Sequence, residues 1–192
     1  ARGAAVHALL EWSQANGWRE PSAELAQRHL IAAGLTRETP RPQESTVSVL
    51  ARGLAEELLD PVRKWIASPL RERIGGAARI RAEVPILLDV GGTVLRGSID
   101  LLVEREGAPP LVVDYKTDRL GGATPGEKAA GYETQRTIYA LAATEALGAE
   151  EVEVAYVFLE RAEEPALTTL GPAEMAAGRA RLEGAVARIG AG

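Results

Sequence analysis

The stretch LVVDYKTD, residues Leu111–Asp118, decides the fold of this 192-residue chain. Its apolar start predicts a buried strand, and residues two apart on a strand share a face, so Asp114 and Lys116 project together. Unpaired charges are costly in a core. This acid and ammonium must therefore be compensated by each other, by another charged residue, or by a metal ion and a substrate phosphate. The chain has only three lysines, so one beside an aspartate on an interior strand suggests a catalytic pair.

The rest of the chain divides into helical and extended patterns. Amphipathic spacing predicts five helices, over residues 3–16, 22–33, 46–68, 124–147 and 172–189. Apolar alternation predicts strands over residues 78–90, 93–105, 111–117 and 152–159 and near Leu167. We expect a kink or break at Pro61, a hairpin turn at Gly91-Gly92, and a polar linker over 36–45. The order predicts an α/β (α+β) fold, a mixed central β-sheet flanked by helices, with an N-terminal helical segment.

The composition excludes several kinds of cross-link and metal site and bears on the kind of partner. The chain contains no cysteine, so disulfides, cysteine-ligated zinc and an iron–sulfur cluster are excluded. The net charge of −5 is mildly unfavourable for a nucleic-acid partner, since phosphate binding usually needs a basic excess. Bound divalent cations, however, invert the field of an acidic site.

Length and termini predict the domain organisation. We expect one domain over residues 1–192, with a helical part over 1–70 and an αβ core over 76–192. The chain starts without a methionine, which suggests a piece excised from a longer polypeptide. We find no signal peptide and no apolar run of membrane-spanning length, so we expect a cytoplasmic protein with no membrane partner.

A second carboxylate accompanies the Asp114–Lys116 pair in the predicted sheet. Asp100 lies on the more polar face of the preceding strand, and it approaches Asp114 if the two strands are neighbours. Two carboxylates held together repel unless a cation lies between them, and oxygen ligands suit Mg²⁺ or Mn²⁺. The alternative is a pair of solvated aspartates at the rim of the sheet.

A polar stripe follows on the next predicted helix. Tyr132, Gln135 and Tyr139 have the spacing i, i+3, i+7, which places them on one helical face. Amides and phenols bind phosphate oxygens and aromatic rings stack on bases; alternatively these are interfacial tyrosines and a surface glutamine. His7 is either a structural residue of the first helix or an imidazole ligand. Glu83 either orients Lys116 or caps the sheet edge, and the structural role is favoured.

Together these motifs closely resemble the RecB-type nuclease domain of the PD-(D/E)xK superfamily, found at the C-terminus of AddA/RecB-like helicase–nucleases. They occur in that family's order across nearly the whole chain. The matching stretches are GAAVHALLE (3–11), AEVPI (82–86), GSIDLL (97–102), VVDYKTD (112–118) and GYETQRTIYA (131–140). The lack of cysteines favours the AddA/RecB side over relatives that carry an iron–sulfur cluster.

The resemblance implies a restriction-endonuclease-like core and an Mg²⁺-dependent deoxyribonuclease of exonuclease type, in which Mn²⁺ can substitute. The implied metal ligands are Asp100, Asp114, the Tyr115 carbonyl and His7. Lys116 would act with the two aspartates in catalysis by positioning or polarising the attacking water. Implied DNA contacts are Thr117, Tyr132, Gln135 and Tyr139.

The resemblance also implies partners and a process. The substrate would be single-stranded DNA or unwound ends, in double-strand-break repair and recombination. The partners would be ATP-dependent helicase domains of the same parent chain and a second helicase–nuclease subunit. Two alternatives stay open, namely a catalytically inactive nuclease-like domain that grips DNA or scaffolds a helicase complex, and a stand-alone nuclease.

Overall fold

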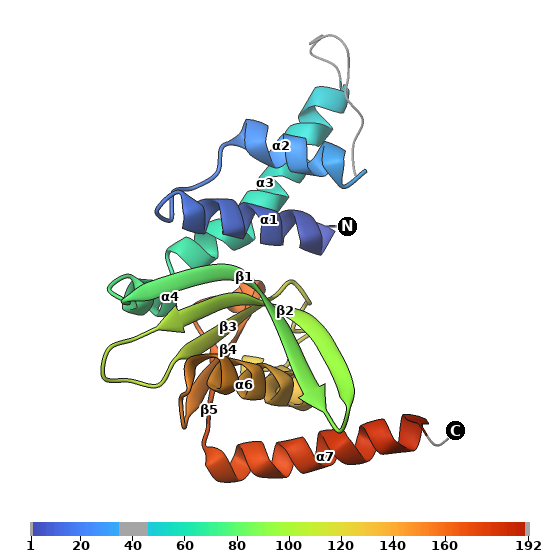
Figure 1. The fold of residues 1–192 in the computed structure, drawn as a ribbon. Helices are drawn as coiled ribbons and strands as arrows, with labels where there is room; N and C mark the ends of the chain where they lie inside the picture. Colours follow the sequence, from blue (N-terminus) through green and yellow to red (C-terminus); the bar gives the residue numbers. More distant parts are fainter. Residues whose placement is uncertain (1, 35–45, 191–192) are drawn as a thin grey trace. The chain divides into compact units, whose positions relative to one another are not determined.

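The computed structural model describes residues 2–34 and 46–190 of the chain (Figure 1), and the predicted linker over 36–45 lies outside the described residues. The chain forms two compact units, each assembled from separate segments. The first, which we call the helical unit, comprises Ala1–Arg73, Thr117–Arg119 and Leu159–Glu163. The second, the sheet unit, comprises Ile74–Lys116, Leu120–Phe158 and Glu164–Gly192.

The helical unit packs its helices around an apolar core. Its elements are α1 (Arg2–Ala15), α2 (Ala23–Ala32), α3 (Thr46–Ile66), nearly all of α4 (Pro69–Ile74) and the 3-10 turn η2 (Leu159–Arg161). Leu9, Leu58 and Trp65 are almost fully buried. Trp18 meets Trp65 edge to face with ring centroids 6.0 Å apart, a favourable aromatic geometry. This core explains why the N-terminal sequence is helical and apolar on one side.

Helix α3 continues through Pro61 to Ile66, so the expected break at this proline is absent. A proline has no N–H and leaves the carbonyl four residues earlier without its helical donor. Here that carbonyl belongs to Glu57, and the Arg2 guanidinium lies 3.3 Å from it as a replacement donor. The same guanidinium forms an ion pair of 2.9 Å with the Glu57 carboxylate.

The sheet unit is built on five strands in the order β1-β2-β3-β4-β5. They are β1 (Arg79–Val90), β2 (Thr93–Glu104), β3 (Leu111–Lys116), β4 (Val152–Phe158) and β5 (Ala166–Leu170). All neighbours are antiparallel except β3 and β4, which are parallel. Gly91 and Gly92 join β1 to β2 with φ of 58° and 83°, the left-handed backbone of a two-residue hairpin turn. The mixed sheet confirms the predicted fold class.

Helices provide the crossover that the parallel pair requires. The chain passes from β3 to β4 through α5 (Pro125–Ala129), the 3-10 turn η1 (Ala130–Tyr132) and α6 (Glu133–Leu147), and it closes with α7 (Pro172–Gly190). A single helix over 124–147 was expected, and the 3-10 turn interrupts it. Gly131 favours such an interruption because glycine is a poor helix former, and Tyr132 leaves helical geometry at φ −106° and ψ 20°.

The core of the sheet unit lies between the sheet and α6, with α7 closing it. Ile99, Val112 and Val154 of the sheet are buried in one cluster with Ala140 and Ala143 of α6. These alanines let the helix approach the strands closely, because they add almost no side-chain volume. The central strands are thereby fixed on a rigid support.

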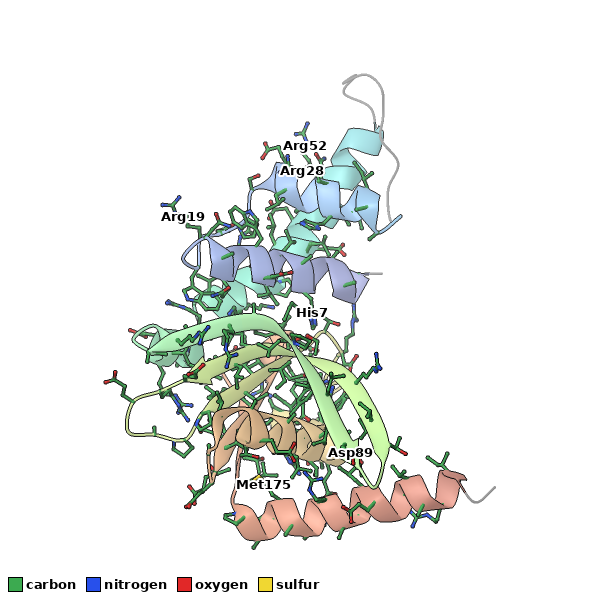
Figure 2. The ribbon with its side chains drawn as sticks, in the orientation of Figure 1. His7, Arg19, Arg28, Arg52, Asp89 and Met175 are labelled. Atoms are coloured by element: carbon green, nitrogen blue, oxygen red, sulfur yellow. The ribbon has the colours of Figure 1, made fainter. Side chains whose placement is uncertain are left out.

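Helix α7 is attached at both its beginning and its middle. The Thr144 hydroxyl of α6 lies 3.5 Å from the Met175 sulfur, and Arg179 donates to the Asp89 carbonyl at 3.1 Å. Figure 2 shows Met175 on α7 and Asp89 near the tip of the β1–β2 hairpin. Within residues 2–34 and 46–190, no helix has the length and apolar character needed to cross a membrane.

Candidate active site

The centre of the candidate site is the end of β3, where Asp114 and Lys116 project from one face. Lys116 Nζ lies 2.7 Å from Asp114 Oδ2, and the two side chains are only 12% and 5% exposed. Strand β3 lies between β2 and β4, so the pair sits in the middle of the sheet. A buried ion pair of this kind needs further polar partners to offset its desolvation.

Gln135 and Tyr139 extend the ion pair into a chain of hydrogen-bonded polar side chains. Lys116 Nζ donates to Gln135 Oε1 at 2.8 Å, and Gln135 Nε2 donates to the Tyr139 hydroxyl oxygen at 2.9 Å. The Asp114 charge raises the pKa of Tyr139, and Tyr139 lowers that of Asp114, so the four side chains form one polar cluster, which we call the ring. Gln135 and Tyr139 lie four residues apart on α6, so both can face the same strand. The ring orders four side chains in one place.

Two tyrosine rings enclose the ammonium of Lys116. Its Nζ lies 4.1 Å from the centroid of the Tyr132 ring and 5.2 Å from that of Tyr156, both within cation–π range. The Tyr156 hydroxyl donates to the Tyr132 carbonyl at 3.0 Å. This bond ties the 3-10 turn η1 to β4 and holds the Tyr132 ring beside the ammonium.

Asp100 reaches the same end of β3 from the neighbouring strand. The β2–β3 ladder ends with Leu101 opposite Val113, and its register, continued by one residue, places Asp100 opposite Asp114. Asp100 Oδ2 accepts a hydrogen bond of 2.6 Å from the Tyr115 backbone N–H. The Asp100 side chain therefore accepts the hydrogen bond of the Tyr115 N–H at the point where the β2–β3 ladder ends.

Glu83 of β1 brings a third carboxylate to this region. One of its oxygens lies within 4.8 Å of an Asp100 oxygen, and the Ser98 hydroxyl donates to Glu83 at 3.1 Å. Glu83 has a φ of 48°, a left-handed backbone that is uncommon for any residue except glycine. Such strained residues cluster at functional sites.

Burial and charge change the proton affinity of the site. Burial is the main reason that the pKa of Asp114 is raised, and the nearby Asp100 charge raises this pKa further, while Lys116 opposes both effects. Burial also raises the pKa of Tyr139 and of Tyr156, so both hydroxyls stay protonated hydrogen-bond donors at neutral pH.

The donor chemistry of Asp100, Asp114 and Glu83 fits a divalent cation. All three offer carboxylate oxygens, which are the ligands that Mg²⁺ and Mn²⁺ prefer. The charge of Asp100 makes ionisation of Asp114 less favourable, and a cation between two carboxylates removes that repulsion.

The structure places the other predicted site residues as follows. His7 lies on α1 and Thr117 in the Thr117–Arg119 segment, and both belong to the helical unit. The Tyr115 ring is buried, at 5% exposure. A Cβ on Gly3 would lie 3.0 Å from Thr117 Oγ1, so α1 and this loop are in close contact at Gly3. The roles predicted for His7, Thr117 and the Tyr115 carbonyl stay predictions.

Two residues of this arrangement differ from what the sequence predicted. Tyr156 was not singled out, although the parallel register pairs it with Asp114; the signal was available once β3 and β4 were taken as neighbours. Glu83 was interpreted mainly as a cap of the sheet edge. Its place in the hairpin register, facing Asp100 across β1 and β2, was the sign that it belongs with the carboxylates.

Comparison with known proteins identifies the family to which the chain belongs. The sequence matches the PD-(D/E)XK nuclease superfamily over residues 1–191, and the chain belongs to that superfamily. It is also 32% identical over 120 residues to an ATP-dependent helicase/nuclease subunit of Carboxydothermus hydrogenoformans. This alignment covers 54% of the chain but only 10% of that much longer relative.

Two solved structures show a weaker likeness. The protein SSO0001 has a TM-score of 0.41 and 18% identity, with 83% of this chain and 82% of that chain covered. A protein of Eubacterium rectale, named as a candidate exonuclease, has a TM-score of 0.46 and 14% identity, with 92% and 70% covered.

Proposed function

We propose that this chain is a divalent-metal-dependent deoxyribonuclease of exonuclease type that hydrolyses phosphodiester bonds at the end of β3. The observation that carries the proposal is the ring of Asp114, Lys116, Gln135 and Tyr139, linked by an ion pair and two hydrogen bonds, with Asp100 beside it. An ion pair with a purely structural role would need neither the carboxylates of Asp100 and Glu83 nor the left-handed backbone of Glu83. An oxygen-rich centre with one ordered ammonium is what phosphate chemistry requires.

Each residue of the ring has a role in this proposal. Asp100 and Asp114 would hold Mg²⁺, or Mn²⁺ in its place, with the Tyr115 carbonyl as a further ligand. When bound, such a cation supplies Lewis-acid polarisation of the phosphate and a water that ionises near neutral pH. Lys116 carries a compact positive charge that can stabilise the charge developing on a non-bridging phosphate oxygen or orient the attacking water.

Gln135 and Tyr139 would both order Lys116 and contact the DNA backbone. In the ring the Gln135 amide accepts from Lys116 and donates to Tyr139, so its orientation is fixed. A phosphate that arrives at Lys116 meets an amide and a phenol that are already in place. Positioning of this kind lowers the cost of reaching the transition state.

We also propose that the nuclease acts in double-strand-break repair, with helicase domains that deliver single-stranded or unwound DNA ends. The relative from Carboxydothermus hydrogenoformans carries the name of a helicase/nuclease, and a motor that unwinds DNA supplies the substrate that an exonuclease of this kind needs. A second helicase–nuclease subunit would be a further partner.

Cleavage of an end-labelled single-stranded oligonucleotide tests the proposal. Wild-type protein should cut with Mg²⁺ or Mn²⁺ and stop on addition of EDTA, and Asp114→Asn and Lys116→Met should each cut at least about a hundredfold more slowly. Glu153→Gln is a matched control, because it breaks another half-buried ion pair of the same sheet, Arg105–Glu153 at 2.9 Å, away from the ring. Undiminished cutting by either ring variant would refute the assignment.

The alternative function is a nuclease-like domain that only grips DNA or scaffolds partners. Loss of catalysis in such a domain is expected to remove a carboxylate or the lysine, and here Asp100, Asp114 and Lys116 are all present. The same assay separates the two functions. An inactive domain would bind the oligonucleotide without cutting it under any divalent metal.

A further inference from the structure

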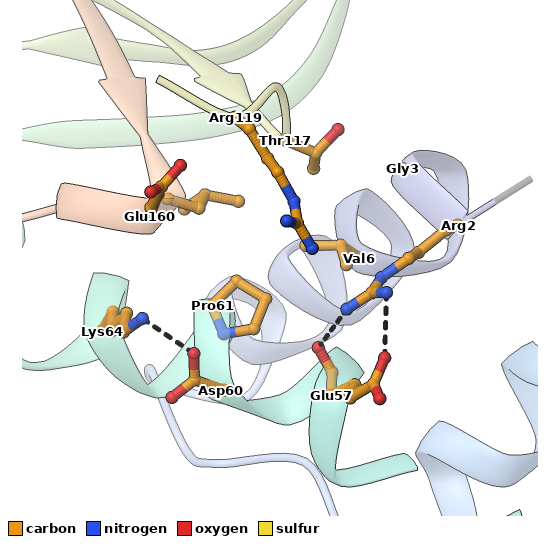
Figure 3. A pocket seen from close by; sticks show the side chains of 11 residues that line it. Arg2, Gly3, Val6, Glu57, Asp60, Pro61, Lys64, Thr117, Arg119 and Glu160 are labelled. Atoms are coloured by element: carbon orange, nitrogen blue, oxygen red, sulfur yellow. Dashed lines mark hydrogen bonds and ion pairs between the residues drawn. The ribbon is translucent and has the colours of Figure 1, made fainter. Parts of the chain in front are cut away.

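A pocket within the helical unit is the strongest feature outside the ring of Asp114 and Lys116. It has a volume of about 480 Å³ and is lined by α1, α3, the 117–119 segment and η2. Figure 3 shows Arg119 extending into this pocket, with Val6 and Arg2 of α1 below it. The volume exceeds that of a phosphate group several times, so the pocket can admit part of a larger ligand.

The acids of α3 in this pocket are already neutralised. Arg2 forms its ion pair with Glu57 at 2.9 Å, and Lys64 forms one with Asp60 at 2.8 Å. Both appear as dashed lines in Figure 3. The third acid of the lining, Glu160, takes part in an interaction of its own. The lining holds three acids and three cations, so it has no net negative charge to repel an anion.

Arg119 is the cation of the pocket lining that takes no part in the Arg2–Glu57 and Lys64–Asp60 ion pairs. Within the described part of the chain its guanidinium has neither a carboxylate nor a hydrogen-bond partner. A guanidinium presents five N–H donors in a planar fork that matches the oxygens of a phosphate. An extended, unpaired arginine in a pocket is therefore a ready ligand for such an anion.

The polypeptide itself connects this arginine to the proposed catalytic lysine. Arg119 follows Lys116 by three residues, so their Cα atoms are at most about 11 Å apart. Successive phosphates of a DNA strand are spaced closely enough for one strand to supply an anion to each residue. A separate small anion would have no reason to be held at this distance from the lysine.

We propose that Arg119 and its pocket bind a backbone phosphate of the single-stranded DNA substrate, a few nucleotides from the bond that is cut. The inference rests on the proposed nuclease function and adds the substrate-holding residue. Thr117 and Gly3 define the wall beside it, since a Cβ at Gly3 would lie 3.0 Å from Thr117 Oγ1. Arg119 itself, in the loop between β3 and α5, pairs with no other described residue.

Equilibrium binding of a fluorescein-labelled oligothymidylate in EDTA tests the inference without any cutting. Arg119→Ala should weaken binding roughly tenfold at low salt. It should also reduce the slope of log K against log salt by about 0.7, the value for loss of one phosphate contact on a single strand. Arg119→Lys should keep the slope and recover part of the affinity, because it keeps the charge but loses the fork.

Arg28→Ala is the matched control. Arg28 is an exposed arginine on α2 in the same unit (Figure 2), outside the pocket and without an ion pair within the described residues. Its loss removes the same charge and should leave affinity and slope nearly unchanged. Equal effects of Arg28→Ala and Arg119→Ala would overturn the inference, because they would reflect net charge alone.

Two further outcomes would also overturn it. One is an unchanged salt slope in Arg119→Ala. The other is binding of inorganic phosphate by the wild-type pocket with no effect of Arg119→Ala on the oligonucleotide, which would make this a small-anion site. Each outcome leaves metal-dependent cutting by the Asp114–Lys116 centre intact, so the inference can fail while the proposed function stands.

Discussion

Asp114 and Lys116 stand two residues apart on a strand, and Gln135 and Tyr139 stand four residues apart on a helix. Each spacing repeats the period of its own element, so each pair presents one face. When α6 packs on the sheet, the two faces meet and the four polar groups form a ring. The site is thus a consequence of two simple periodicities and one packing contact.

A double-mutant cycle tests the contact between Lys116 and the Tyr132 ring, which are 4.1 Å apart. We expect Tyr132→Leu and Lys116→Met to be coupled by about 1 kcal/mol in the free energy of unfolding, measured by urea denaturation. Tyr132→Phe, which keeps the ring, should preserve the coupling. Additive effects within about 0.3 kcal/mol would show that the ring does not hold the ammonium.

At the scale of elements, local signals in the sequence determine where helices begin and end. Thr124 accepts a hydrogen bond from the Glu127 N–H while the Glu127 carboxylate accepts one from the Thr124 N–H, a complete capping box. Gly148 ends α6 in the left-handed conformation at φ 64°, as glycine commonly does after a helix. Both ends were predicted from the sequence.

The capping box should make stability depend on pH. The hydrogen bonds to Thr124 lower the pKa of Glu127 in the folded protein. The Glu127 carboxylate therefore contributes fully to the stability of the fold above its ordinary pKa. This contribution is lost as the pH falls through the lowered pKa of the folded state. The difference in melting temperature between wild type and Glu127→Ala should therefore narrow below about pH 4. A difference that stays constant from pH 7 to pH 3 would contradict this cause.

The five strands and the ends of most helices could be predicted because they depend on local chemistry. Helix α4 was missed, although Ser68 precedes Pro69 and accepts a hydrogen bond from the Arg71 N–H at 3.2 Å; the element is only six residues long. The 3-10 turn at Tyr132 was also missed. Its conformation depends on Tyr156 and Lys116, which are distant in sequence.

In the candidate site, too, only the features that depend on local sequence could be predicted. Asp100, Asp114 and Lys116 could be selected from strand periodicity, whereas Tyr156 and the position of Glu83 depend on which strands are neighbours. The Glu57 carbonyl, which Pro61 leaves without a helical donor, is bonded by Arg2, nearly sixty residues earlier than Pro61. Interactions of this kind cannot be predicted from a local window of sequence.

At the scale of the whole molecule, the helical unit is not a simple N-terminal segment. Two short stretches from later in the chain belong to it, Thr117–Arg119 and Leu159–Glu163. The second of these contributes Leu159 and Ala162, which are 2% and 0% exposed. Folding of the helical unit therefore requires segments on both sides of the crossover.

Deletion of residues 1–73 should consequently damage more than the helices that it removes. We expect the 74–192 fragment to expose Leu159 and Ala162, to melt well below the intact chain and to aggregate, because burial of a leucine side chain alone contributes about 1.5–3 kcal/mol. The melting temperatures of the fragment and of the full chain can be compared by circular dichroism. A fragment that unfolds cooperatively at the melting temperature of the full chain would contradict the assignment of Thr117–Arg119 and Leu159–Glu163 to the helical unit.

We have proposed that carboxylates at the end of β3 hold a divalent metal for phosphodiester hydrolysis. Anomalous diffraction from a crystal soaked in Mn²⁺ tests it most directly. We expect an Mn²⁺ peak with oxygen ligands from Asp100 and Asp114 at about 2.1 Å, which is lost in Asp114→Asn. Density for Mn²⁺ that involves neither carboxylate, or no bound metal while DNA is still cut, would contradict it.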